Sequence, residues 1–253
     1  MNHFVPVELK IYFGVTVLVS LLLLARALRA GQIMGRGRPG SGERAHEWVA
    51  AFFWIGALAW IGLQSAVTRT GFYRVPNITP PRFLLAIGPP VLLAVIVPFT
   101  KAGKRLIDTM SLKWTVLFHA VRILVEIGLL RLFIYGRVPR LMTFEGGNYD
   151  IAIGLTAGAA WWGYSQGFYG RKTLAVWNAI GLLSLLNAVG RALLSAPFPF
   201  QRFAFDQPTV AILHFPFVLL PAFIVPAALF LHIAMFRMAL FSRGRAVNAP
   251  EIS

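Results

Sequence analysis

The sequence contains no cysteine and few charged residues. None of its 253 residues is cysteine, and 13% are Asp, Glu, Lys or Arg, whereas about a quarter are charged in soluble domains. The lack of cysteine excludes disulfides, thiolate metal ligands, cysteine nucleophiles and palmitoylation. The low charge, together with 57% hydrophobic residues, indicates a chain whose apolar surface is solvated by a lipid bilayer.

Acidic residues are especially scarce. The chain has 9 Asp and Glu against 24 Lys and Arg, which gives a net charge of +15. A basic patch on one face would favour a nucleic-acid partner, but here the basic residues flank apolar stretches. We therefore exclude nucleic acid and expect basic cytoplasmic loops to contact anionic lipid headgroups.

Several motifs of known chemistry are also missing. The chain has no P-loop, no Rossmann glycine signature and no Gly-x-Ser-x-Gly elbow. The last apolar stretch, residues 210–236, has no lysine, which excludes a retinal Schiff base. Composition and motifs together favour a protein without enzymatic activity.

What the sequence does contain is seven apolar stretches of about 17 residues or more, the length needed to cross a bilayer. They predict an all-α polytopic membrane protein, a bundle of seven transmembrane helices forming one integral membrane domain over residues 1–253. The first stretch is interpreted as a retained helix and not as a cleaved signal. The predicted helices are 11–28, 48–66, 83–99, 114–135, 150–167, 174–194 and 210–236.

The distribution of basic residues predicts the orientation of the bundle. One set of alternate connections carries 13 Lys and Arg and the other set carries 8. Because the more basic side of a membrane protein is cytoplasmic, we expect the N-terminus outside and the C-terminus inside. Residues 30–46 are then a flexible basic cytoplasmic loop, and residues 243–253 are a disordered tail.

The predicted helix 114–135 carries His119, Arg122 and Glu126 on one face, because residues three and four apart lie on the same side of a helix. Glu126 lies about 18 Å along the axis from Trp114, close to the middle of the bilayer. A charge at that depth should face the bundle and be paired. Arg122 and Glu126 therefore form either a structural ion pair or a charged element of a substrate or proton path.

Two histidines on different predicted helices lie at matching depth. His119 and His232 both fall near the cytoplasmic end, because helices 114–135 and 210–236 run in opposite directions. Two such rings are candidate ligands for a haem iron or for half of a metal site. In the alternative interpretation, His119 bonds Glu126 or a backbone carbonyl oxygen, and His232 lies in the membrane interface.

Polar residues also gather where the outer connections meet predicted helices 150–167, 174–194 and 210–236. Asp150 and Asp206 each stand at or just before a predicted helix, where a carboxylate can cap backbone N–H groups. Several polar groups beside aromatic rings are typical of a small-ligand site. The candidate outer pocket consists of Glu145, Asn148, Asp150, Asn187, Arg191, Arg202, Asp206 and His214.

Three segments, residues 118–126, 142–156 and 195–207, resemble segments of an uncharacterised group of bacterial multi-pass membrane proteins. The resemblance covers about half of the chain and brings no activity and no functional residue. It implies a location in the bacterial inner membrane.

Four functions remain open on the sequence. The leading hypothesis is binding or transport of a small ligand or lipid at the outer pocket. The alternatives are a redox subunit that binds haem or metal through His119 and His232, a membrane enzyme acting on a lipid or prenyl substrate, and a structural or assembly subunit of a membrane complex.

Overall fold

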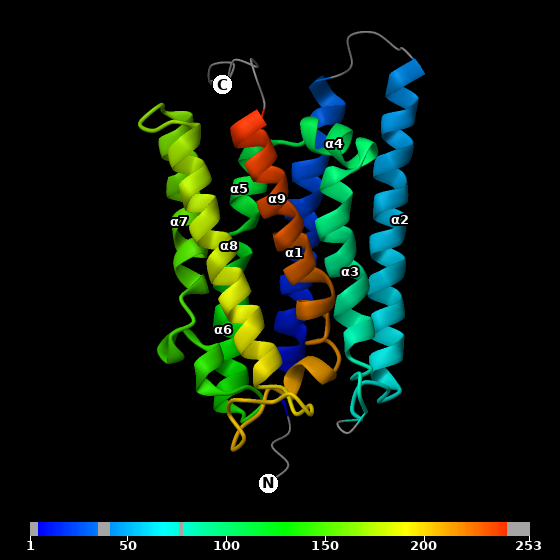
Figure 1. Ribbon diagram of the computed structural model, residues 1–253, viewed down its shortest axis with the longest axis vertical. Helices are drawn as coiled ribbons and strands as arrows, with labels where there is room; N and C mark the ends of the chain where they lie inside the picture. The colour runs from blue at the N-terminus through cyan, green and yellow to red at the C-terminus, as the bar shows by residue number, and fades with distance from the viewer. Residues whose placement is uncertain (1–4, 35–40, 76–77, 242–253) are drawn as a thin grey trace.

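The computed structural model describes residues 5–34, 41–75 and 78–241, and these residues are all helical or irregular (Figure 1). The long helices run side by side along one axis. α1 begins at one end of the bundle and α9 finishes at the other. The α-helices are α1 Val7–Met34, α2 Ser41–Arg69, α3 Leu84–Ile96, α4 Lys101–Asp108, α5 Leu112–Phe118, α6 Val121–Ile134, α7 Asp150–Ser165, α8 Arg171–Leu194 and α9 Val225–Phe241.

Within the described residues, four helical segments are long and apolar enough to cross a membrane. A fifth candidate arises if α3 and its 3-10 extension count as one span with α4, from which they are bent by 79°. Over residues 5–34, 41–75 and 78–241 the protein is therefore all-α, with four to five candidate membrane spans. The four segments are Val7–Leu28, Ala51–Arg69, Arg171–Leu194 and Leu220–Leu240.

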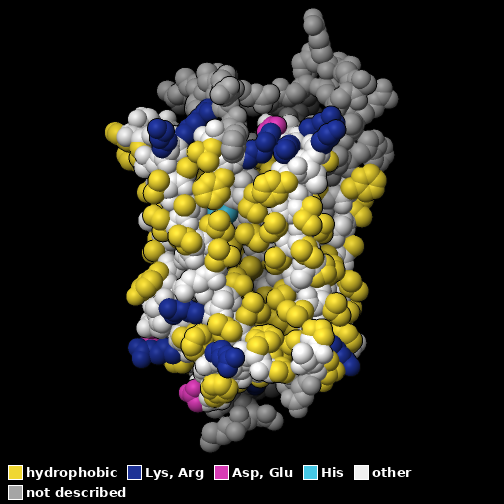
Figure 2. Space-filling model, in the orientation of Figure 1, with side chains coloured by type: hydrophobic (Ala, Val, Ile, Leu, Met, Phe, Trp, Pro, Cys, Tyr) yellow, Lys and Arg dark blue, Asp and Glu magenta, His cyan; other side chains and the backbone are white. Residues whose placement is uncertain are grey.

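The outer surface of the bundle has the pattern expected of a membrane protein. Large apolar side chains such as Leu22, Phe52, Leu92 and Leu183 are exposed around its middle. Figure 2 shows this apolar band between two ends where Lys and Arg side chains gather. In water such a surface would be costly, whereas in hydrocarbon it is solvated.

Two of the predicted helices are interrupted. The predicted helix 114–135 is split into α5 and α6 by a turn at His119 and Ala120. The predicted helix 210–236 begins only at Leu220, with a π-helical turn, Leu220–Ile224, that leads into α9. Pro216 and Pro221 explain this late start, since a proline lacks the N–H that an α-helix requires.

Small residues let α7 pack inside the bundle. Gly154, Ala157, Ala160 and Gly163 recur every three residues on its buried face. A side chain at Gly154 would press on Ile123 of α6, with a Cβ only 2.9 Å from its Cγ1. This close approach brings the N-terminus of α7 against α6.

The basic loop predicted at residues 30–46 has its centre, residues 35–40, outside the described residues. The predicted tail, residues 243–253, lies outside them as well.

Candidate functional site

Eight polar side chains from α6, α7, α8, α9 and the segments beside them meet inside the bundle. We call this set the buried polar network. Seven of its members are at most 5% exposed, and Ser184 is half-buried. The network consists of His119, Arg122, Glu126, Asn148, Asp150, Asn178, Ser184 and His232.

Arg122 lies at the centre of the network and donates in three directions. Its Nη1 bonds the Asp150 carboxylate and, at 3.1 Å, the Gly181 carbonyl oxygen. Its Nη2 lies 2.6 Å from Nε2 of His232. Because a guanidinium can only donate, this Nε2 accepts. The ring proton is then on Nδ1, which lies 2.7 Å from the Asn178 Oδ1 acceptor.

Asp150 joins three helices through one carboxylate oxygen. It is the first residue of α7, and the helix has no side-chain cap bond at its start. The capping role expected for Asp150 is therefore not its role in the structure. Its Oδ1 accepts from Arg122 on α6 and from the Ser184 hydroxyl of α8 at 2.8 Å.

Glu126 does not form the ion pair with Arg122 that their spacing predicts. Its Oε1 instead accepts a 2.6 Å hydrogen bond from Nδ2 of Asn148. Its other oxygen, Oε2, is buried and has no hydrogen-bond partner among the described residues. A buried carboxyl oxygen without a partner is costly, so it is the feature of this site that most needs an explanation.

The charges of the network balance only when it holds a proton. Two carboxyl groups, on Glu126 and Asp150, share the interior with one guanidinium, on Arg122. With both carboxyls ionised this group has a net negative charge, which is expensive in hydrocarbon. One bound proton makes it neutral.

The two histidines predicted to lie at one depth do meet. The rings of His119 and His232 stack with their centroids 4.1 Å apart and their planes at 25°. Neither nitrogen of His119 has a hydrogen-bond partner among the described residues.

This stacked geometry does not fit a haem iron held between the two rings. Such an iron would lie between two nitrogens that point at each other, whereas these rings lie face to face. Both nitrogens of His232 are also already engaged with Arg122 and Asn178. Across the described part of the chain, no group of three or more His, Cys, Asp or Glu could hold a metal ion.

Helices are discontinuous around the network. α5 and α6 break at His119, α7 begins at Asp150, and α9 is preceded by the π-helical turn Leu220–Ile224. A cavity of about 30 Å³ lies between Arg122, Asp150 and this turn, and has room for a water molecule. Broken helices and π-helical turns at membrane depth are typical of functional sites.

The candidate outer pocket is not assembled as predicted. Asn148 and Asp150 turn inward and join the network. Arg191 donates to the carbonyl oxygens of Leu141 and Gly146, and so fastens the connection that precedes α7. His214 lies with its Nδ1 2.9 Å from the carbonyl oxygen of Val210. The other four residues, Glu145, Asn187, Arg202 and Asp206, are exposed.

The cap predicted at Asp206 is wrong. Residues 201–210 are irregular, and the next long α-helix, α9, begins only at Val225. The carboxylate of Asp206 therefore has no helix start to cap.

Asn178 and Ser184 of α8 are site residues that the sequence did not reveal. Asn178 is the polar member of the buried face of α8, which also includes Leu174, Gly181 and Leu185. A polar residue within an apolar stripe is the sequence signal by which Asn178 could have been identified as a site residue.

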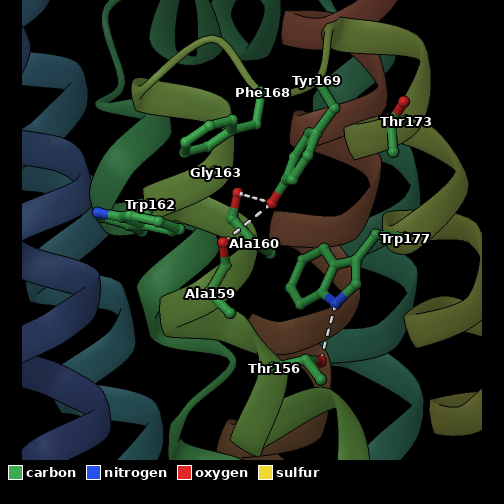
Figure 3. A pocket seen from close by; sticks show the side chains of 9 residues that line it. All are labelled: Thr156, Ala159, Ala160, Trp162, Gly163, Phe168, Tyr169, Thr173 and Trp177. Atoms are coloured by element: carbon green, nitrogen blue, oxygen red, sulfur yellow. Dashed lines mark hydrogen bonds between the residues drawn. The ribbon is translucent and has the colours of Figure 1, made fainter.

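A second, larger cavity of about 580 Å³ opens between α7 and α8, beside the turn that joins them (Figure 3). Trp177 forms one wall, and its indole N–H donates to Thr156. The Tyr169 hydroxyl points at α7 and donates to the carbonyl oxygens of Ala159 and Ala160. Burial raises the pKa of this hydroxyl above its ordinary value.

Trp177 also separates this open cavity from the histidine pair. Its ring centroid lies 6.0 Å from that of His119, at an interplanar angle of 70°. One aromatic side chain, that of Trp177, therefore lies between the network and a cavity that opens at the α4 end of the bundle.

Residues 80–240 match the model of a family described as a domain of unknown function (DUF8737). The match covers more than half of the chain and includes every residue of the buried polar network. No curated protein and no solved structure matches the chain.

Proposed function

The chain belongs to the DUF8737 family, and on that premise we propose that it is a multi-pass membrane protein that binds and passes protons through the buried polar network. The observation that carries this proposal is the buried Oε2 of Glu126, which lacks a partner inside an apolar bundle. Ionisable groups at membrane depth mark proton and substrate paths. We place the protein in the bacterial inner membrane.

The size of the inner cavity favours a proton over a larger solute. About 30 Å³ beside Arg122 and Asp150 admits a water molecule, whereas small-molecule sites measure roughly 300 Å³ or more. The exposed positions of Glu145, Arg202 and Asp206 also favour the network over an outer ligand pocket. The binding or transport activity predicted from the sequence is therefore assigned to the buried polar network and not to the outer pocket, and its proposed substrate is the proton.

The proposed architecture has seven crossings. Five of these crossings are the four long spans and the α3 segment. The sixth is α5 together with α6, which are separated by only two residues, and the seventh is α7. α7 has 16 residues, or about 24 Å. The connection before it, held by Arg191, completes the crossing within the bundle.

Cysteine labelling tests this architecture, because the chain has no cysteine of its own. With the α4 end cytoplasmic, Asp206→Cys should react with an impermeant maleimide on intact cells. Lys172→Cys, in the first turn of α8, should react only after lysis. Labelling of both on intact cells would show that the two sites share a face and that the seven-crossing orientation is incorrect.

Proton flux into proteoliposomes tests the function. With a trapped pH-sensitive dye and an imposed membrane potential, the wild-type protein should acidify the lumen faster than protein-free vesicles do. Glu126→Gln should slow this flux about tenfold or more, which corresponds to about 1.4 kcal/mol of added barrier. The substitution keeps the shape of the side chain and removes the site that takes up the proton.

Glu8→Gln is the matched control, since Glu8 is an exposed acid at the start of α1, and it should conduct like the wild type. Equal flux through Glu126→Gln and wild type, or a wild-type rate equal to that of protein-free vesicles, would refute the proposal.

A further inference from the structure

A third cavity, of about 340 Å³, lies on the other side of the bundle, between α2, α3 and the beginning of α9. We call it the α2 crevice. Apart from the Trp60 indole nitrogen, its lining side chains are apolar, and aromatic rings form much of its wall. The residues that line it include Phe53, Gly56, Trp60, Pro90, Leu93 and Phe230.

α2 closes the crevice loosely. Only a small share of its membrane-spanning segment is buried against the rest of the chain. Near the middle of the helix, Nε1 of Trp60 donates to the carbonyl oxygen of Ala222 at 3.0 Å, and the rings of Phe53 and Phe230 lie 6.4 Å apart. The space beside this wall is lined by apolar side chains, so an apolar molecule can fill it without a desolvation penalty.

A basic amphipathic helix lies at one end of the crevice. Val97 lines the crevice and stands four residues before Lys101, the first residue of α4. The bend of 79° turns α4 away from the direction of α3. α4 buries Leu106 and Ile107 and exposes its three basic side chains, Lys101, Lys104 and Arg105.

The acid on α4 is already paired. Asp108 accepts two hydrogen bonds from Arg237 of α9, at 3.0 and 2.9 Å. This pair ties α4 to the end of α9. It leaves the exposed face of α4 with an excess of positive charge close to Val97, which lines the crevice.

We infer that the α2 crevice holds one acyl chain of an anionic phospholipid whose phosphate is bound by Lys101, Lys104 and Arg105. The apolar wall matches the chain, and the basic helix matches the headgroup. The bilayer supplies this ligand at high concentration.

A lipid in the crevice would also touch the edge of the proton site. Ala222 and Phe223 of the π-helical turn line the crevice, while Leu220 and Ile224 of the same turn line the small cavity beside Arg122. The lipid site is nevertheless separate from the proposed proton function, because no residue of the buried polar network lines the crevice. Glu126→Gln should therefore leave lipid binding unchanged.

Native mass spectrometry of the detergent-purified protein, titrated with phosphatidylglycerol or phosphatidylcholine, tests this inference. The wild type should bind one phosphatidylglycerol more tightly than phosphatidylcholine. Gly56→Leu should weaken both lipids about tenfold or more, since a Cβ at Gly56 meets nothing within 4 Å and a larger side chain fills the crevice. Gly62→Leu is the matched control, because Gly62 is also open on α2 but does not line the crevice.

The headgroup site is tested separately. Lys101→Gln combined with Lys104→Gln should weaken phosphatidylglycerol about thirtyfold, or roughly fivefold per lysine. Phosphatidylcholine should lose much less, because its choline group cancels the charge of its phosphate. Equal loss for both lipids, no loss for either, or equal effects of Gly56→Leu and Gly62→Leu would overturn the inference.

A second measurement needs no substitution. Phosphatidylglycerol with a photoactivatable group at the end of one acyl chain should label residues 52–60 or 89–97 of the wild-type protein. Adducts found only on the outer faces of α7 and α8 would show that lipids merely coat the bundle, and would refute the site.

Discussion

Replacing Arg122 by glutamine should destabilise the folded protein by about 3–5 kcal/mol. Removing one member of a buried ion pair leaves the other charge without a partner, which costs about that much. Here the change also removes the donor to His232 Nε2 and to the Gly181 carbonyl oxygen. Unfolding of the purified protein in detergent, followed by circular dichroism against temperature or denaturant, measures the loss.

Arg131→Gln is a close control for this change. Arg131 lies on the same helix, α6, and is exposed, so its substitution should alter the free energy of unfolding by no more than about 0.5 kcal/mol. A similar small effect of Arg122→Gln would mean that the buried pair does not hold α6 to α7.

The partner of Arg122 can be identified by a double-mutant cycle. Because Arg122 bonds Asp150 and not Glu126, Arg122→Gln with Asp150→Asn should show a coupling energy of about 0.5–3 kcal/mol. Arg122→Gln with Glu126→Gln should be closer to additive. The reverse ranking would restore the pair that the helix spacing predicts.

The helices could be foreseen from the sequence because their cause is local. A long apolar run needs a helix to satisfy its backbone in hydrocarbon, so the class of fold and the approximate positions of the spans follow from hydropathy. The break at His119 does not follow, because hydropathy is nearly unchanged across it, whereas Pro216 and Pro221 mark the break before α9 in the sequence. The turn at His119 and the π-helical turn at Leu220 lie inside runs that remain apolar.

The site could be foreseen only in part, since its partners come from different helices. Depth along each helix was enough to bring His119 and His232 together. Spacing within α6 paired Arg122 with Glu126, but a carboxylate from a neighbouring helix, Asp150, takes that place. Such a choice depends on how α7 packs, which no single helix encodes.

That packing leads to the second large effect, which we expect at Gly181 of α8. A Cβ at this position would lie 2.8 Å from Cε1 of His232 and 3.2 Å from Cγ2 of Ile153. Gly181→Ala should therefore push the His232 ring away from Arg122, at a cost of about 1–3 kcal/mol for an overpacked core. Thermal unfolding in detergent measures this cost, and the proteoliposome assay should show slower proton flux.

Gly190→Ala separates this clash from a general effect of alanine on α8. A Cβ at Gly190 meets nothing within 4 Å, so alanine there should be neutral or stabilise the helix by up to about 1 kcal/mol. If the two variants unfolded alike, close contact between α8 and α9 would not be what positions His232. If Gly181→Ala lost stability but kept full proton flux, His232 would belong to the scaffold of the network, and Glu126 with Asp150 would be left as its proton-binding part.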